Sequence, residues 1–106
     1  MKIIKVTEEM IEFDNGNRIT HYHDQDCCES VYADFEAIDD IAYDYEFEEP
    51  LTFEEVENFG FRFGNKGKMV SVPCYNCQNG WYSDDLEIRY CWDVVITDCE
   101  KKDEIY

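Results

Sequence analysis

The chain has 106 residues, of which 26 are Asp or Glu and 9 are Lys or Arg, giving a formal net charge of −17. This length fits one domain, which we place at residues 1–106, and the content of 44% hydrophobic and 16% aromatic residues excludes intrinsic disorder. The charge disfavours direct binding to nucleic acid or to an anionic membrane, and it favours a basic protein as the partner.

No apolar run reaches the roughly 20 residues of a membrane span, and the first residues lack the apolar core of a signal peptide. We therefore expect a cytoplasmic protein whose six cysteines are reduced. Reduced cysteines favour a metal site or buried thiols over disulfides.

The N-terminal part of the chain predicts short strands. Residues 3–6 form the first of them, and residues 11–14 and 18–23 then flank Asn15-Gly16. This dipeptide is typical of the type I′ turn of a β-hairpin, because such a turn needs positive φ angles at both of its central residues.

The next stretch predicts a short helix. Phe35, Ile38, Ile41 and Ala42 recur at three-to-four residue spacing, and Asp34 precedes them in a position from which it can cap the helix.

Alternation then returns. Aromatic and acidic residues alternate strictly over residues 43–48, which predicts a strand with one anionic face. Residues 52–59 fit either a helix that begins with a capping box or a charged edge strand, and both alternatives stay open. Residues 59–63 and 68–72 predict a second hairpin around an Asn-Lys-Gly turn.

The C-terminal third predicts a loop over residues 74–80, strands over residues 86–92 and 94–96, and a frayed tail after about residue 99. Together the elements predict an α+β domain: a small, mostly antiparallel β-sheet with one or two short helices.

Eleven acidic residues and no Lys or Arg occur in residues 34–57. A solvated face explains most such runs, but here the single sign of charge and the interleaved aromatics favour an interface with a basic protein. Such a face can imitate the phosphates of a nucleic acid. The residues from which we expect partner recognition are Asp34, Glu36, Asp39, Asp40, Tyr43, Asp44, Tyr45, Glu46, Glu48 and Glu49.

Two cysteine-containing stretches can together form a metal site. Cys74 and Cys77 have the spacing of half a zinc site, and residues 21–29 can supply Cys27 and His23. We therefore predict structural zinc on these four residues. The alternative ligands are Cys28, His21, Cys91 and Cys99, although the apolar strand around Cys91 favours a core position for that thiol.

Other chemistries of the same residues stay open. Cys74 and Cys77 could form a redox pair, although the usual βαβ context is missing. A small cysteine-dependent enzyme could use Cys27 or Cys28 as the nucleophile and His23 as the base. All six cysteines could instead be inert buried thiols. We expect a non-enzymatic protein.

Residues 23–32, His-Asp-Gln-Asp-Cys-Cys-Glu-Ser-Val-Tyr, resemble the H-x-Q-D-C-C-E-x-V-Y signature of a family of small, uncharacterised phage and bacterial proteins. Residues 79–83, Asn-Gly-Trp-Tyr-Ser, are similar to the N-G-Y-Y-S ending of that family. The resemblance covers roughly residues 11–90, and the chain departs from the family pattern at Cys74 and Cys77.

The resemblance implies a fold and an origin in a mobile element, in an infected or lysogenic host cell, but no activity. By analogy of class alone, a small acidic phage protein fits the inhibitors of host defence nucleases, including anti-CRISPR proteins. We therefore expect a partner such as a CRISPR effector nuclease.

Overall fold

The computed structural model describes residues 1–24, 30–77 and 85–104 and has an almost all-β fold. Strands hold 53% of the described residues and short helical turns hold 9%. The predicted α+β class is therefore wrong, since the longer of the two helical turns spans only five residues. Within the described ranges, no helix is long and apolar enough to cross a membrane.

The first sheet has five strands, and each hydrogen-bonded pair in it is antiparallel. Its strands, in spatial order, are β1 (Ile3–Val6), β2 (Met10–Phe13), β3 (Arg18–Tyr22), β8 (Glu87–Tyr90) and β9 (Asp93–Ile96).

The second sheet is built around its longest strand, β7 (Lys68–Cys77). The C-terminal part of β7 pairs antiparallel with β4 and parallel with β10, and its N-terminal part pairs antiparallel with β6. The other strands are β4 (Ser30–Ala33), β5 (Thr52–Val56), β6 (Gly60–Asn65) and β10 (Lys102–Glu104).

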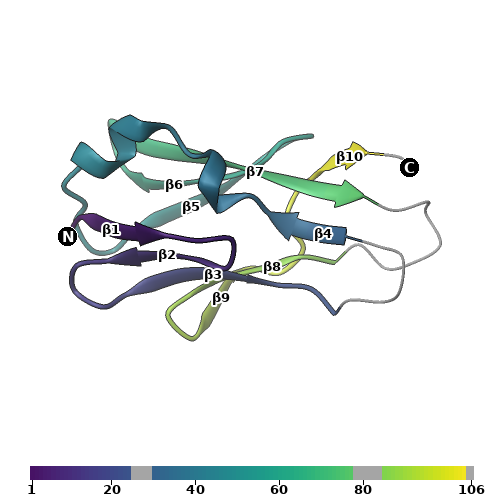
Figure 1. The fold of residues 1–106 in the computed structure, drawn as a ribbon, viewed down its shortest axis with the longest axis horizontal. Coiled ribbons are helices and arrows are strands. Elements are labelled where there is room, and N and C mark those ends of the chain that lie inside the picture. Colours follow the sequence, from purple (N-terminus) through teal and green to yellow (C-terminus); the bar gives the residue numbers. More distant parts are fainter. Residues whose placement is uncertain (25–29, 78–84, 105–106) are drawn as a thin grey trace.

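The hydrophobic core lies between the two sheets, which Figure 1 shows one above the other. Alternation along the strands directs apolar residues inward, so that Ile19 is buried in β3 while its neighbour Arg18 is exposed. Aromatic rings join the layers: Phe13 of β2 packs edge-on against Phe63 of β6, with 6.3 Å between ring centroids. The fold is therefore a small β-sandwich.

The turn between β2 and β3 differs from the predicted type I′ turn. Gly16 has a φ of +89°, but Asn15 is not among the described residues with positive φ. The Gly16 N–H donates to the Phe13 carbonyl, and the Phe13 N–H donates to the Asn17 carbonyl, which makes a three-residue turn. A type I turn followed by a left-handed glycine is the usual solution for this loop length.

The predicted helix after β4 is also wrong, because two 3₁₀ turns, η1 (Phe35–Ala37) and η2 (Asp40–Asp44), take its place. In an α-helix the carboxylates of Glu36, Asp40 and Asp44 would stack at four-residue spacing, and like charges at that spacing destabilise a helix. Ile41, which the helical pattern placed on the apolar face, is 52% exposed.

The later segments settle two further expectations. Residues 43–48 do not form a strand, since Tyr43 and Asp44 belong to η2 and residues 45–48 have no regular structure. Of the two alternatives for residues 52–59, the strand is correct, because Thr52–Val56 form β5 at the edge of the second sheet. In β5, Glu54 lies opposite Arg62 and forms an ion pair with it at 2.6 Å.

The C-terminal part of the chain is more ordered than its composition indicated. β7 continues through Cys77, where a loop was expected. Cys99 is fully buried, and Lys102–Glu104 form β10 beside β7, in the region where we expected a frayed tail.

Candidate functional site

The acidic-aromatic segment, defined here as residues 34–49, crosses from the end of β4 toward β5 (Figure 1). It is held to the core by four buried side chains and presents acidic side chains outward. The buried anchors are Phe35, Ile38, Ala42 and Phe47. The exposed acids are Glu36, Asp39, Asp40, Asp44, Glu46, Glu48 and Glu49, while Asp34 is half-buried.

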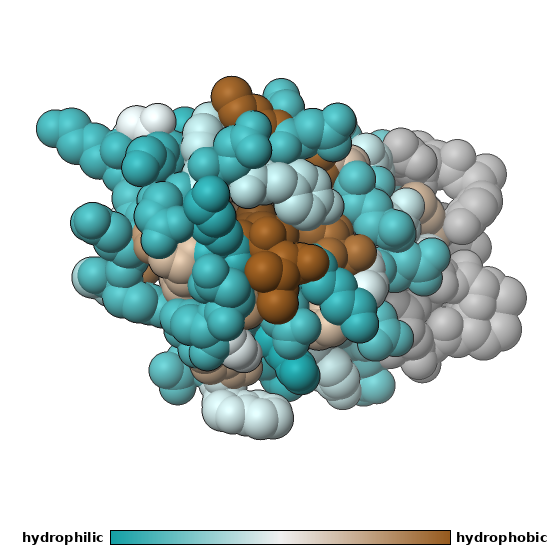
Figure 2. All heavy atoms as spheres, turned by 60° about the vertical axis from the view of Figure 1, so that its left-hand side comes forward, coloured by the Kyte–Doolittle hydropathy of each residue, from teal (hydrophilic) through white to brown (hydrophobic). Residues whose placement is uncertain are grey.

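The aromatic residues of this segment divide between surface and core. Tyr43 is 41% exposed, Tyr45 is half-buried and Phe47 is 1% exposed. Tyr43 and Tyr45 are therefore available beside the acids, and the exposed Ile41 adds an apolar side chain. Figure 2 shows one face of the molecule, on which a group of hydrophobic residues interrupts a largely hydrophilic surface.

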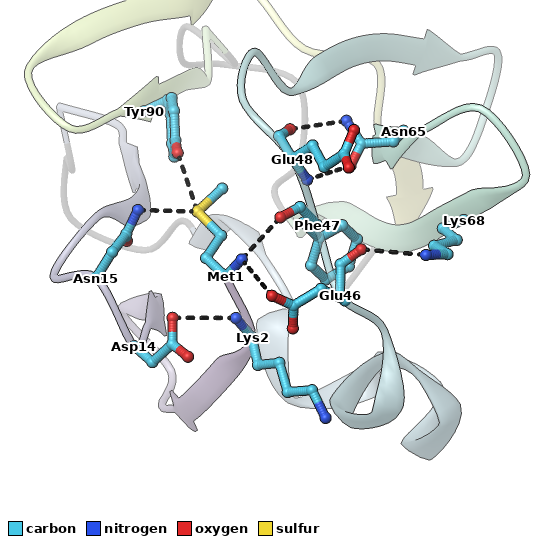
Figure 3. A network of polar contacts seen from close by, with 10 residues as sticks. All are labelled: Met1, Lys2, Asp14, Asn15, Glu46, Phe47, Glu48, Asn65, Lys68 and Tyr90. Atoms are coloured by element: carbon cyan, nitrogen blue, oxygen red, sulfur yellow. Dashed lines mark hydrogen bonds and ion pairs between the residues drawn. The ribbon is translucent and has the colours of Figure 1, made fainter.

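The first contact that fixes the segment is made by the amino group of Met1 (Figure 3). It donates to the Phe47 carbonyl at 2.7 Å and forms an ion pair with Glu46 at 3.1 Å. The Phe47 N–H donates in return to the Met1 carbonyl at 2.8 Å, and Lys68 donates to the Glu46 carbonyl at 3.3 Å. Residues 46–47 are thereby held between Met1, which precedes β1, and Lys68 of β7.

A second contact holds Glu49 against the first sheet. The Asn17 side-chain amide donates to the Glu49 carboxylate at 2.7 Å and to the Tyr90 hydroxyl at 2.9 Å. The Tyr90 hydroxyl also donates to Glu49. Burial, followed by this bond to Glu49, raises the pKa of Tyr90. The Glu49 carboxylate is therefore used within the protein.

Other acids of the segment keep their charge available. Within the described residues, the carboxylates of Glu36, Asp40, Asp44 and Glu48 form no ion pair with a basic side chain. Asp39 is occupied differently, since it accepts a hydrogen bond from the Ile41 N–H at 3.1 Å and so caps η2. The exposed charge is therefore concentrated around η1, η2 and Glu48.

A cavity of about 520 Å³ lies on one side of the segment. The carboxylates of Glu8, Glu9, Asp34 and Glu36 line it, together with Tyr32 and His21. It is therefore an anionic cavity that suits a cationic side chain.

His21 at this cavity is held as a neutral ring. The Ala33 N–H donates to Nδ1 at 3.1 Å, so the hydrogen lies on Nε2, which is 3.1 Å from the Glu8 carbonyl. The ring packs edge-on against Phe35, and burial lowers the pKa of His21. His21 therefore joins β3, β4 and the turn before β2, and both of its nitrogens are engaged.

A second cavity, of about 410 Å³, lies between η2 and the second sheet. Ile41, Tyr45, Phe59 and Met69 are among the apolar residues that line it, and Lys102 lies over the Phe59 ring at 4.8 Å. This cavity suits an apolar side chain of a partner, beside the charged residues of η2.

Two of the predicted zinc ligands, Cys74 and Cys77, lie in a β-strand and not in the tight turn that usually presents such a pair to zinc. Cys74 and Cys77 both lie in β7, where side chains three residues apart point to opposite faces. Cys74 is fully buried with its Sγ 3.9 Å from the Cys99 Sγ, and the hydrogen bond to Cys99 together with burial raises the pKa of Cys74.

His23, the third predicted ligand, has its Nδ1 2.6 Å from the Asp85 carbonyl oxygen. Cys27 and Cys28 lie outside the described residues. One of these two cysteines is the predicted nucleophile of the alternative, cysteine-dependent enzyme. Among the described residues, no three His, Cys, Asp or Glu side chains are arranged to hold a metal ion. The zinc site and the enzymatic alternative both stay predictions.

Several residues that shape the segment were missed by sequence reasoning. The Met1 amino group, Asn17, Asn65 and Tyr90 bind it from distant parts of the chain. Turn asparagines carry no signal of a long-range partner, because the same residue type satisfies local turn geometry.

The comparison with family models gives a match to "Domain of unknown function (DUF7448)" over residues 1–88. No curated protein and no solved structure matches the chain. The match confirms the resemblance at the level of an uncharacterised domain family.

Proposed function

The chain belongs to the DUF7448 family of domains of unknown function, and we propose that it is a non-enzymatic binding protein whose acidic-aromatic segment recognises a basic partner. The observation that carries the proposal is the group of carboxylates on Glu36, Asp40, Asp44 and Glu48. They are exposed and have no basic side-chain partner within the described residues. A surface of this kind steers a cationic partner and favours its encounter.

The two cavities beside the segment supply shape in addition to charge. The anionic cavity at His21 can receive a Lys or Arg side chain, and the apolar cavity at Ile41 and Tyr45 can receive an aliphatic or aromatic one. An interface with apolar anchors inside a charged rim is the usual arrangement of a specific complex. The two cavities would thereby restrict which basic proteins bind.

The proposed class of partner rests on the net charge and on the sequence resemblance to small phage and bacterial proteins. We propose that the partner is a nucleic-acid-binding defence protein of the host, such as a CRISPR effector nuclease, whose basic groove the segment occupies in place of nucleic acid. The protein would then act in the host cytoplasm as an anti-CRISPR-type inhibitor. This step rests on analogy of class and on the electrostatic argument.

Structural zinc on Cys74, Cys77, Cys27 and His23 is a separate proposal from the sequence. Elemental analysis of the purified protein and of the Cys77→Ser variant tests it. The predicted site requires bound zinc that the substitution removes, and a metal-free wild-type protein would exclude the site.

The binding function is tested by a pulldown from host lysate, with the captured proteins identified by mass spectrometry. We expect capture of a basic nucleic-acid-binding protein that weakens as NaCl is raised, because added salt screens exposed charges. Added single-stranded or duplex nucleic acid should compete with the chain for that protein. Capture that is insensitive to both additions would argue against the proposal.

A further inference from the structure

The turn of the β8–β9 hairpin presents a tryptophan to solvent. Cys91 and Trp92 form this turn between the paired residues Tyr90 and Asp93, and Trp92 is 96% exposed. Cys91, expected in the core, is half-buried and has a φ of +57°, a conformation that residues other than glycine rarely adopt. The Cys91 N–H donates to the Arg18 carbonyl at 2.8 Å, which fixes the turn beside β3.

A cavity of about 520 Å³ opens at this turn. Its lining includes Asn17, Arg18, Thr20, Arg89 and Trp92, and no Asp or Glu of the described residues lines it, although Glu12 and Glu87 pair with the two arginines. Its volume is in the range of sites that bind small molecules. In a chain with a net charge of −17, a cavity lined by two arginines is unusual.

The two arginines are neighbours on one face of the first sheet. Arg89 of β8 lies opposite Thr20 of β3, so Arg18, two residues before Thr20, is its diagonal neighbour. The chain has only three arginines, and two of them line this cavity.

Each arginine has an acidic neighbour on the same sheet, but some of its donors have no partner among the residues that the structure describes. Arg18 forms an ion pair with Glu12 at 3.3 Å, and Arg89 forms one with Glu87 at 2.5 Å. A guanidinium has five N–H donors, and the hydrogen bonds to Glu87 use only Nε and one terminal nitrogen of Arg89. The remaining donors can bind a phosphate in the bidentate geometry that arginine favours.

We propose that this cavity binds a free nucleotide, with its phosphate held by Arg18 and Arg89 and its base stacked on Trp92. An exposed indole is a stacking platform for any nucleobase, and the Thr20 hydroxyl can form a hydrogen bond with the ribose or the base. The cavity shares only Asn17 with the contacts that hold the acidic-aromatic segment, and its arginines and Trp92 lie outside that segment, so this proposal does not depend on the proposed function. A longer strand is disfavoured because the rest of the chain would repel its phosphates.

The test is a titration of the protein with adenosine monophosphate, followed by NMR chemical shifts. We expect saturable shifts at β3 and the β8–β9 turn, and about tenfold weaker binding for Trp92→Ala and for the double variant Arg18→Gln, Arg89→Gln. Trp92→Phe should retain most of the affinity, because it keeps a flat ring. Arg62→Gln is the matched control, since Arg62 also pairs with a glutamate but lies in the second sheet, and its affinity should equal that of the wild type.

Further ligands separate the parts of the proposal. Inorganic phosphate and adenosine should each bind more weakly than adenosine monophosphate, and a short oligonucleotide should bind no more tightly. The proposal is overturned by the absence of saturable shifts at millimolar nucleotide, by equal binding of inorganic phosphate, or by tighter binding of the oligonucleotide. Full affinity in Trp92→Ala would also overturn it, and that variant should fold normally because the indole is exposed.

Discussion

Asn65 and Glu48 are joined by two hydrogen bonds between a strand end and the acidic-aromatic segment. The Glu48 N–H donates to the Asn65 Oδ1 at 2.6 Å, and the Asn65 Nδ2 donates to the Glu48 carbonyl at 2.9 Å (Figure 3). Both bonds use the backbone of Glu48, so its carboxylate remains exposed. The contact therefore fixes the segment without neutralising its charge.

Asn65→Ala should remove both bonds and loosen residues 46–49. We expect a loss of about 1–3 kcal/mol in the free energy of unfolding, because each bond contributes about 0.5–1.5 kcal/mol. Hydrogen exchange of the Glu48 amide should also accelerate. Lys66→Ala, at the exposed neighbouring position, is the control, and equal effects of the two variants would contradict the role of Asn65.

Phe47 is the buried aromatic anchor of the segment, and its ring contacts Phe13, Tyr45 and Phe63 with centroids 5.7–5.9 Å apart. Phe47→Ala should lower the free energy of unfolding by about 3–5 kcal/mol, because it leaves a cavity between the sheets. Tyr43→Ala removes an exposed ring from the same alternating stretch. It should change the free energy of unfolding by no more than about 0.5 kcal/mol. Chemical denaturation measures both, and a comparable loss at the two positions would show that the segment is not anchored as described.

His21 should make stability depend on pH. Burial lowers its pKa below the ordinary 6.5, so the unfolded chain takes up the proton first as the pH falls. The contribution of neutral His21 is therefore complete above pH 6.5 and is lost progressively below it. Protonation of Nδ1 would also break the bond from the Ala33 N–H.

The measurement is the free energy of unfolding from about pH 7 to about pH 5 for the wild type and for His21→Gln. We expect the wild type to lose stability relative to the variant in this range. Trp92→Ala, which changes an exposed side chain that does not titrate, serves as the control and should behave as the wild type. Parallel curves for wild type and His21→Gln would contradict the assignment.

Cys74 should be inert toward alkylation in the native protein. It is fully buried, and its hydrogen bond to Cys99 and its burial raise its pKa, so that little thiolate forms at neutral pH. Cys91, half-buried at the β8–β9 turn, should react first among the described cysteines. Peptide mapping after timed iodoacetamide treatment checks the order, which would be refuted if Cys74 reacted as fast as Cys91.

The strands were more predictable from the sequence than the segment between them. Alternation located β1, β3 and β6 closely, because the core requires one apolar face on each strand. The helix expected from Phe35, Ile38 and Ile41 failed, since that spacing says nothing of the like charges that a helix would stack.

The composition of the sequence located the candidate site but did not predict its geometry. The acids of residues 34–49 could be read directly from the sequence. The sequence did not show which of these acids are free, because Glu46 and Glu49 are bound by residues from distant parts of the chain, namely Met1, Asn17 and Tyr90. The pairing of β1, β2, β3 and β8 in the first sheet brings Met1, Asn17 and Tyr90 close together.

The central claim is that the acids around η2 recognise a basic partner by their charge and position. Its most direct test compares the affinity of two double variants for the partner. The first variant combines Asp40→Lys and Asp44→Lys, and the second combines Glu57→Lys and Asp93→Lys. All four residues are exposed, and both variants change the net charge equally. We predict at least about tenfold weaker binding for the first variant and near wild-type binding for the second. Equal loss in the two, or no loss in the first, would contradict the claim.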